Sequence, residues 1–326
     1  MLGRISMLGL MAGFSSLSLA WAAEQGSGLT RVTLLPQWIP QAQFAGYYLA
    51  LEKGIYRSNG LDVVILTGGP RQNLEGALRS GEATFITHFL SSALKLRENG
   101  LPLVNLAQVG QRSALLLVAR RGSGIRRVED LAGKKVSIWS DFAVQPLALF
   151  RRYNLDVQVI PQGATINLFM RGGVDAASAM WYNEYHLMLN AGLNENEVTL
   201  IFYDQHGLNF PEDGLYCLDK TWRDQPELCR RFIRASLAGW EYAFSHEEES
   251  LAVILRYAEE ARTGTNASHQ RWMLRRMQDI ILPRQTAPPL GTLRKEDFDT
   301  VCRELKSSGM INHVPVFEEF HVGASN

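Results

Sequence analysis

Cysteine is scarce in this sequence, which contains only Cys217, Cys229 and Cys302. None of the three belongs to a Cys-x-x-Cys pair, so the sequence does not favour zinc binding or dithiol redox chemistry. Cys229 and Cys302 each fall on an apolar helical stripe, where a buried, inert thiol is the usual arrangement. We therefore predict no metal site and no cofactor. An odd number allows one disulfide at most, and whether Cys217 and Cys229 form it stays open.

An excess of charge of either sign is also absent, because 33 Lys and Arg residues are balanced by 33 Asp and Glu residues. A nucleic-acid-binding surface needs clustered basic residues, and a membrane-surface helix needs a strongly charged face beside an apolar one. The sequence shows neither pattern. The balance excludes nucleic acid as the expected partner and leaves a small molecule as the better candidate.

Long hydrophobic runs are missing as well. The run at the N-terminus, Met7–Leu19, is shorter than the roughly 20 residues that a membrane span needs. It follows Arg4 and ends at Ala20-Trp21-Ala22, a small-x-small pattern typical of signal-peptide cleavage. We predict that residues 1–22 are a signal peptide and that the mature protein is periplasmic. An uncleaved N-terminal anchor is the alternative.

The rest of the sequence is long enough for two domains, and 46% hydrophobic residues suffice for a full core. Short apolar runs alternate with helix-like segments, which predicts parallel sheets with helices on both faces. The expected strands are Val32–Leu35, Val63–Leu66, Thr84–Thr87, Val104–Val109, Ala114–Ala119, Lys135–Ile138, Val157–Ile160, Ala177–Trp181 and Leu200–Tyr203. The expected helices between them are Ala45–Lys53, Asn73–Ser80, Ser91–Glu98, Gln145–Arg152 and Ile166–Arg171.

The C-terminal third has a helical pattern throughout. Apolar residues recur at three- and four-residue spacing in Gln225–Ser245, Leu251–Tyr257, Arg271–Ile281 and Lys295–Leu305. We expect these helices to pack their apolar stripes against the sheets.

Several short motifs follow one another in an informative order. Gln37–Ile55 reads QWIPQAQFAGYYLALEKGI, and GLDV at 60–63, LRSGEA at 78–83, VEDLAGKKV at 128–136 and GVDA at 173–176 follow it. In this order the sequence resembles the SsuA/ThiY-like family of substrate-binding proteins, which also includes the thiamine-pyrimidine synthases. The resemblance implies an α/β, type II periplasmic binding protein fold. Two lobes, each with a mostly parallel sheet flanked by helices, would enclose a ligand, and a helical region would end the chain.

In that fold, residues 23–118 form the first part of lobe 1, residues 119–206 form lobe 2, and residues 207–326 complete lobe 1. The chain would cross between the lobes near Val118–Arg121 and near Asp204–Asp213, where Gly and Pro suit a hinge. The second segment also contains the polar residues Asp204, His206, Glu212 and Asp213. Because nothing fixes them on one face, we interpret them as surface residues and not as a metal site.

Ligands of open parallel sheets bind beyond the carboxyl ends of the strands, near the first turns of the following helices. The turns expected there supply the candidate ligand-binding residues. These are Trp38, Gln43, Tyr47, Arg71, His88, Ser113, Trp139, Tyr182, Asn183 and Glu184.

Trp38 and Glu184 carry the sharpest of these predictions. The Trp38 indole either packs under its own loop or offers a flat surface on which a ring stacks, worth about 0.5–1.5 kcal/mol beyond area burial. A Trp at the matching place lies at the substrate in the thiamine-pyrimidine branch of the family, and this resemblance favours the second role. Glu184 follows an apolar strand, so its carboxylate either accepts N–H groups of the ligand or stabilises the first turn of a helix. Both roles are compatible.

The synthases of this family hold pyridoxal phosphate on a Lys and use a cysteine-rich motif. The matching stretch here, Ala83–Ser92, contains no Lys, and Cys217 stands alone near Gly214–Leu218. His88 is then either a ligand contact or a hydrogen-bonded histidine at a strand end. We predict that the protein is not an enzyme.

The expected function is that of a monomeric periplasmic solute-binding protein that delivers a small nutrient to an ABC transporter permease in the inner membrane. Relatives bind pyrimidines, flavins, sulfonates and nitrate. The balanced charge and the aromatic candidates Trp38, Tyr47, Trp139 and Tyr182 favour a flat heteroaromatic ligand, with a thiamine-type pyrimidine as first choice. A ligand-binding sensor that serves a membrane receptor is the alternative, and a synthase-like enzyme is the less favoured one.

Overall fold

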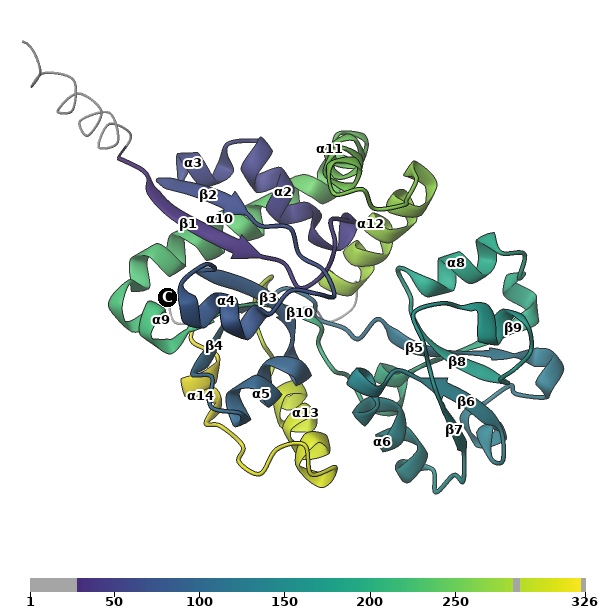
Figure 1. The fold of residues 1–326 in the computed structure, drawn as a ribbon. Helices are drawn as coiled ribbons and strands as arrows, with labels where there is room; N and C mark the ends of the chain where they lie inside the picture. The colour runs from purple at the N-terminus through teal and green to yellow at the C-terminus, as the bar shows by residue number, and fades with distance from the viewer. Residues whose placement is uncertain (1–27, 284–287, 324–326) are drawn as a thin grey trace, which may run out of the picture.

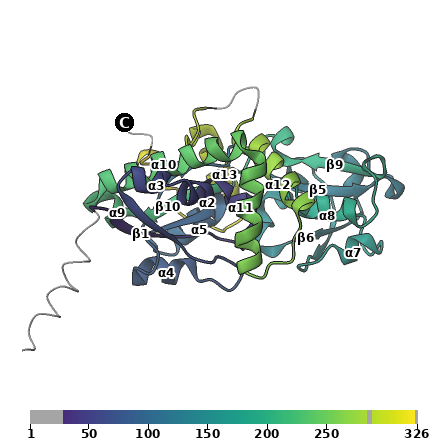
Figure 2. The same cartoon turned by 90° about the horizontal axis from the view of Figure 1, so that it is seen from above.

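The computed structural model describes residues 28–283 and 288–323. The predicted signal peptide, residues 1–22, lies outside this range. The described residues form two lobes that lie side by side (Figures 1 and 2), each built on its own five-stranded sheet. None of their helices is long and apolar enough to cross a membrane.

The sheet of lobe 1 has the strand order β2-β1-β3-β10-β4. β1 pairs in parallel with β2 and β3, whereas β10 is antiparallel to both β3 and β4. The strands are β1 (Thr30–Leu35), β2 (Leu61–Ile65), β3 (Phe85–Phe89), β4 (Leu103–Gln108) and β10 (Asp213–Leu218).

The sheet of lobe 2 repeats this plan with the order β7-β6-β8-β5-β9. Here β6 is parallel to β7 and β8, and β5 is antiparallel to β8 and β9. The strands are β5 (Leu115–Arg120), β6 (Lys135–Ile138), β7 (Gln158–Pro161), β8 (Ala176–Met180) and β9 (Val198–Phe202).

In each sheet the antiparallel strand is the one that the chain enters directly after leaving the other lobe. β5 follows the first crossing and β10 follows the second, and both occupy the fourth place in their sheets. The predicted α/β fold with two mostly parallel sheets is therefore confirmed. The sequence analysis did not recognise β10 as a strand.

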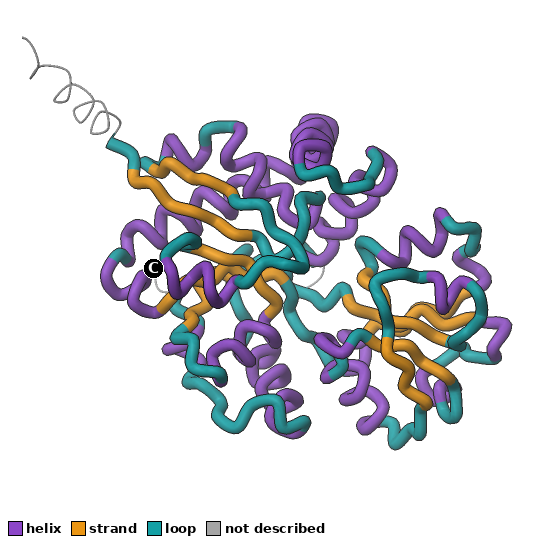
Figure 3. The backbone as a smooth tube through the Cα atoms, in the orientation of Figure 1, coloured by secondary structure: helices purple, strands orange, loops and turns teal. Residues whose placement is uncertain are grey.

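The two crossings are the loops 109–114 and 203–212, seen between the lobes in Figure 3. The sequence predicts the first crossing near Val118–Arg121, with the boundary at residue 118, and the structure corrects this prediction. Val118 lies inside β5, where it pairs with Ala177 of β8 and Leu200 of β9. An apolar run looks the same in either sheet, so its pairing was not evident from the sequence. The second crossing lies within the segment for which a hinge is predicted.

Helices cover the sheet of lobe 1. α10 lies on α2, where Gly46 and Gly239 allow close approach: a Cβ on Gly46 would collide with the Trp240 ring. The helices of lobe 1 are α2 (Ala45–Glu52), α3 (Ile55–Ser58), α4 (Leu74–Ser80), α5 (Leu90–Glu98), α9 (Asp219–Asp224), α10 (Pro226–Ser245), α11 (Glu247–Glu260), α12 (Ala267–Ile281), α13 (Lys295–Ser307) and α14 (Phe317–Phe320). The four C-terminal helical stripes of the sequence are thus α10 to α13.

Lobe 2 is smaller and contains α6 (Val144–Arg152), α7 (Asn167–Met170) and α8 (Glu184–Asn190). α12 of lobe 1 contacts α8, and α13 contacts α6, so C-terminal helices of lobe 1 touch lobe 2 at two places (Figure 1). The three cysteines are buried and form no disulfide in the structure.

Candidate ligand-binding cleft

A cleft of about 380 Å³ has walls from both lobes. This volume lies near the lower end of the range for sites that bury a drug-sized ligand. Lobe 1 contributes Gln37, Trp38, Gln41, Gln43 and Phe89. Lobe 2 contributes Trp139, Ser140, Asp141, Phe142, Gln162, Gly163, Ala164, Met180, Tyr182, Asn183 and Glu184. These residues follow or end the parallel strands β1, β3, β6, β7 and β8, at the sheet edges where ligands of such folds bind.

Many of the predicted site residues line this cleft: Trp38, Gln43, Trp139, Tyr182, Asn183 and Glu184. Trp38 is 40% exposed, which is high for so large a ring, so its indole does more than pack under its own loop. Trp139 donates its indole N–H to the Gly163 carbonyl (3.1 Å), which fixes the ring along the wall of lobe 2.

The other predicted residues, Tyr47, Arg71, His88 and Ser113, do not line the cleft. Tyr47 is only 1% exposed and packs edge-to-face on Trp240, so it belongs to the core. Arg71 is exposed on the loop after β2. Ser113 lies in the first crossing, where its backbone N–H binds Asn209 (2.9 Å). His88 stands behind the cleft, with its Nδ1 2.8 Å from Oε1 of Gln37.

The polar wall of lobe 1 is organised by a buried carboxylate, Asp213. Its oxygens accept hydrogen bonds from the side-chain amides of Gln37 and Gln43, the latter at 2.8 Å. Gln41 in turn donates its amide N–H to Oε1 of Gln43 (2.6 Å). Burial raises the pKa of Asp213 to about 7, while the two glutamine amides act in the opposite direction.

The carboxylate of Glu184, on the wall of lobe 2, accepts hydrogen bonds from groups of its own turn. Oε2 accepts from the Met180 backbone N–H (2.9 Å), and Oε1 accepts from the side-chain amide of Asn183 (2.8 Å). Burial raises the pKa of its carboxyl group. The structural role expected for Glu184 at the start of a helix is therefore present, and its ligand-binding role stays a prediction.

The family model described as NMT1/THI5 like matches residues 41–250. The chain belongs to the NMT1/THI5-like family. The resemblance that the motifs indicated is thereby confirmed.

Members of the NMT1/THI5-like family and proteins of the same fold differ in what they do. Riboflavin-binding protein RibY of Chloroflexus aurantiacus is 30% identical over 256 residues, 76% of this chain and 71% of that protein. The formylaminopyrimidine-binding protein of Halalkalibacterium halodurans is 22% identical over 311 residues, 91% of each chain. The matches also include 4-amino-5-hydroxymethyl-2-methylpyrimidine phosphate synthases of yeasts.

The periplasmic aliphatic sulphonate-binding protein SsuA of Escherichia coli shares the fold. Its structure has a TM-score of 0.69 and 17% identity, covering 90% of this chain and 97% of that one. The type II periplasmic binding protein architecture of this NMT1/THI5-like chain is thus shown by its topology and by this likeness.

Two carboxylates of the hinge have a role that the sequence did not predict. Glu212 and Asp213 are 5% and 2% exposed, so their interpretation as surface residues was wrong. Oε1 of Glu212 accepts the backbone N–H groups of Ala114 (2.6 Å) and Leu115 (2.9 Å), which ties the second crossing to the first. Burial, and next the charge of Asp213, raise the pKa of Glu212 to about 8. The apolar run Gly214–Leu218, which follows them directly and forms most of strand β10, could have indicated that they are buried.

The other members of that polar segment lie elsewhere. Asp204 forms an ion pair with Arg112 of the first crossing, and His206 contacts the Tyr153 hydroxyl with its Nδ1 (2.7 Å). The described residues contain no group of His, Cys, Asp and Glu side chains suited to a metal ion.

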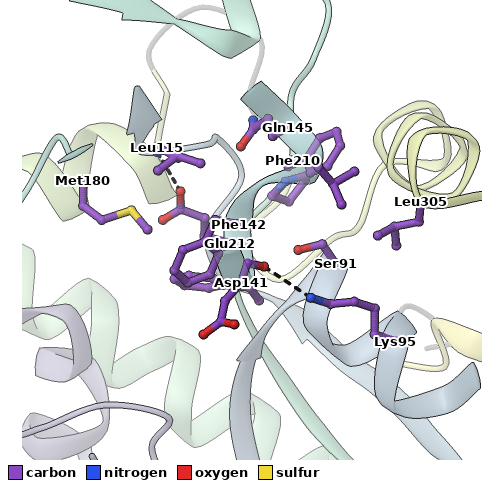
Figure 4. A pocket seen from close by; sticks show the side chains of 13 residues that line it. Ser91, Lys95, Leu115, Asp141, Phe142, Gln145, Met180, Phe210, Glu212 and Leu305 are labelled. Carbon is purple, nitrogen blue, oxygen red and sulfur yellow. Dashed lines mark hydrogen bonds between the residues drawn. The ribbon is translucent and has the colours of Figure 1, made fainter. Parts of the chain in front are cut away.

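A second, much smaller cavity of about 20 Å³ lies at the hinge (Figure 4). Glu212 borders it, and its Oε2 is buried without a hydrogen-bond partner among the described residues. A space of this size holds about one water molecule. Lys95 of lobe 1 also borders it and donates to the Asp141 carbonyl of lobe 2 (3.3 Å).

A histidine pair joins the lobes on another side of the cleft. Nδ1 of His186 on α8 lies 2.8 Å from Nδ1 of His269 on α12, and Nε2 of His269 lies 2.9 Å from Oδ1 of Asn183 in the cleft. Trp272 stacks on His186 and donates its indole N–H to the Trp181 carbonyl (3.1 Å). We call His186, His269 and Trp272 the histidine latch. The helix predicted over Arg271–Ile281 includes Trp272 but not His269, and the sequence gave no sign of this contact.

Proposed function

We propose that this protein is the periplasmic substrate-binding component of an ABC importer. It would capture a flat heteroaromatic nutrient between its lobes and present it to a membrane permease without changing it chemically. The observation that carries the proposal is a cleft of about 380 Å³ with Trp38 on one wall and Trp139 on the other. The NMT1/THI5-like relatives named as binding proteins support it.

The walls of the cleft suit binding better than catalysis on pyridoxal phosphate. β3 and the turn before it, residues 83–89, contain no Lys to form a Schiff base. Lys95 lies on α5 and contacts a backbone carbonyl of lobe 2 at the hinge cavity. Cys217 is buried in β10, away from the residues that line the cleft.

Two ligand classes fit the cleft. A flavin is favoured by the relative RibY and by a volume that accommodates more than one ring. A thiamine-type pyrimidine, the first choice from the sequence, is favoured by the formylaminopyrimidine-binding relative, which aligns over nearly the whole chain. In both cases Trp38 supplies a face for stacking.

A thermal-shift screen with riboflavin, 4-amino-5-hydroxymethyl-2-methylpyrimidine and an alkanesulfonate tests the proposal. We expect one of the two heteroaromatic compounds to raise the melting temperature, because a ligand that binds only the folded state stabilises it. Small-angle scattering should then show compaction as the lobes close, and mass spectrometry should recover the ligand unchanged. Stabilisation by the sulfonate alone, or recovery of a new pyrimidine product, would overturn the proposal.

A further inference from the structure

Asp213 controls the orientation of three glutamine side chains in the wall of lobe 1. Burial raises the pKa of Asp213 to about 7, so above this pH its carboxylate is ionised and has acceptor atoms only, and an amide that faces it must present its nitrogen. Both Gln37 and Gln43 point Nε2 at Asp213. Because a primary amide carries oxygen and nitrogen on opposite sides, the direction of each remaining oxygen is then fixed too.

The orientation of these two amides also fixes the hydrogen-bonding roles of their neighbours. Oε1 of Gln43 accepts from Nε2 of Gln41, which turns the Gln41 carbonyl oxygen away from that contact. Oε1 of Gln37 faces Nδ1 of His88. Burial lowers the pKa of His88 to about 4, so at neutral pH the ring is uncharged and donates from Nδ1. One carboxylate therefore sets the polarity of the whole network.

Each glutamine keeps at least one polar group free for a ligand. All three retain one amide hydrogen, and Gln41 also retains its carbonyl oxygen, with no hydrogen-bond partner for them among the described residues. All three side chains line the cleft. Gln41 and Gln43 are 6% and 2% exposed, so a ligand atom that pairs with them leaves water and must match their polarity.

Building on the proposed function, we propose that Asp213 is a positioning residue that makes this wall select an imide edge, two carbonyl oxygens flanking one ring N–H. Two of the three free amide hydrogens and the free Gln41 carbonyl oxygen complement that edge, which the dioxopyrimidine ring of a flavin carries. A 4-aminopyrimidine edge has one ring-nitrogen acceptor beside its amino group, where an imide has two carbonyl oxygens, so it leaves one more of the amide hydrogens of the wall unpaired. The wall of lobe 1 thus favours a flavin over a pyrimidine as the ligand.

The test compares Asp213→Asn with the wild type by calorimetry at about pH 8, where Asp213 is mostly ionised, using riboflavin, N3-methylriboflavin and 4-amino-5-hydroxymethyl-2-methylpyrimidine as probes. Asn keeps the shape of Asp but offers one acceptor instead of two, so one of the glutamines must turn. We expect riboflavin affinity to fall about tenfold to a hundredfold, and the ratio of riboflavin to pyrimidine affinity to fall with it. The wild type should bind N3-methylriboflavin about tenfold more weakly than riboflavin, since methylation removes the imide N–H.

Two further variants complete the test. Gln43→Met removes one donor and leaves Asp213 in place, so it reports on the same edge if Asp213→Asn folds poorly. We expect it too to lower riboflavin affinity more than pyrimidine affinity. Asp299→Asn, on the exposed side of α13, is the matched control and should leave both affinities unchanged.

The outcomes separate this inference from the proposed function. Riboflavin binding with an unchanged affinity ratio in Asp213→Asn overturns the role of Asp213 and leaves the binding function standing. Tight binding of the aminopyrimidine alone overturns the imide edge but still supports a heteroaromatic nutrient. Binding of none of the three probes by the wild type overturns both.

Discussion

The two walls of the cleft hold their polar groups in different ways. In lobe 1 the amides of Gln37 and Gln43 are fixed by Asp213, the residue at which the second crossing enters β10. In lobe 2 the carboxylate of Glu184 is fixed by groups of its own turn. The wall of lobe 1 is therefore continuous with the hinge, whereas the wall of lobe 2 is organised locally.

This difference assigns different tasks to the lobes. Polar groups that are oriented before the ligand arrives lose little conformational entropy on binding, so the wall of lobe 1 suits recognition of a ring edge. The wall of lobe 2 contributes aromatic area through Trp139 and Phe142, and Asn183 connects it to the histidine latch. We expect the contacts of lobe 1 to determine which ligand binds. We expect lobe 2 to close once that ligand is bound.

Breaking the hinge connection of lobe 1 should have the largest effect. Glu212→Ala removes the acceptor of the Ala114 and Leu115 backbone N–H groups and leaves both buried. We expect the free energy of unfolding to fall by about 3 kcal/mol, since a buried unpaired group costs about 1–3 kcal/mol. Urea denaturation measures this, with the exposed Glu82→Ala as the control. Equal stability of the two variants would show that Glu212 does not anchor the crossings.

The pH dependence of stability tests the burial of the two hinge carboxylates, Asp213 and Glu212. Burial raises the pKa of Asp213 to about 7 and of Glu212 to about 8, so the folded protein retains protons that the unfolded chain releases above about pH 4. Stability from these groups is therefore lost as pH rises through about 7 to 8. Urea midpoints should be lower at pH 9 than at pH 6, and Glu212→Gln should reduce the difference. A midpoint that rises over this interval in the wild type contradicts the burial of these carboxylates.

Ring deletions compare the two walls directly. Trp38→Ala should weaken ligand binding about tenfold through lost stacking and contact area, with little change in melting temperature because Trp38 is 40% exposed. Trp139→Ala should lower both affinity and melting temperature, because this ring also packs on Phe142 and binds the Gly163 carbonyl. Calorimetry and thermal unfolding measure both effects, with Trp222→Ala on α9, outside the cleft, as the control. Full affinity in both ring variants would place the ligand elsewhere.

The strands and helices could be predicted because their apolar patterns are local. Lys135–Ile138 and the stripe of α10 are visible in the sequence as a run and as a spacing. β10 was missed because Pro211 and Gly214 flank its start, and these residues also suit a hinge. The strand that surrounds Val118 was predicted, but its sheet depends on pairing with β8 and β9, which no local pattern specifies.

The candidate site was predicted in outline only, and α2 shows why. Nearly all of its residues are buried, so no periodicity distinguishes the face toward the cleft from the face toward Trp240, and Tyr47 was assigned to the wrong one. Gln43 was predicted, whereas Gln37 and Gln41 were not. Their roles depend on Asp213, which is remote in sequence and adjacent only after the second crossing has been made.

The smallest effect should come from the latch that links the wall of lobe 2 to α12. Nε2 of His269 donates to Asn183, so its Nδ1 must accept from Nδ1 of His186, and the His269 ring must be neutral. Burial lowers the pKa of both histidines, that of His269 to about 4, so acidification below about pH 6.5 works against the closed contact.

Loss of this contact removes about one net hydrogen bond, so ligand affinity should fall roughly fivefold between pH 7 and pH 4.5. In His269→Gln, which keeps a donor and an acceptor but does not titrate, calorimetry should show a smaller decrease. Arg151→Gln is the matched control, because Arg151 is a half-exposed partner of Glu304 (3.0 Å) at the contact of α6 with α13. Such a pair contributes less than about 1 kcal/mol, so this variant should retain the pH dependence of the wild type. At pH 4.5 the affinity of His269→Gln for the ligand should have fallen less than that of the wild type. An equal fall would assign the acid sensitivity to other groups, and the wall of lobe 2 would then have no proton-sensitive connection to lobe 1.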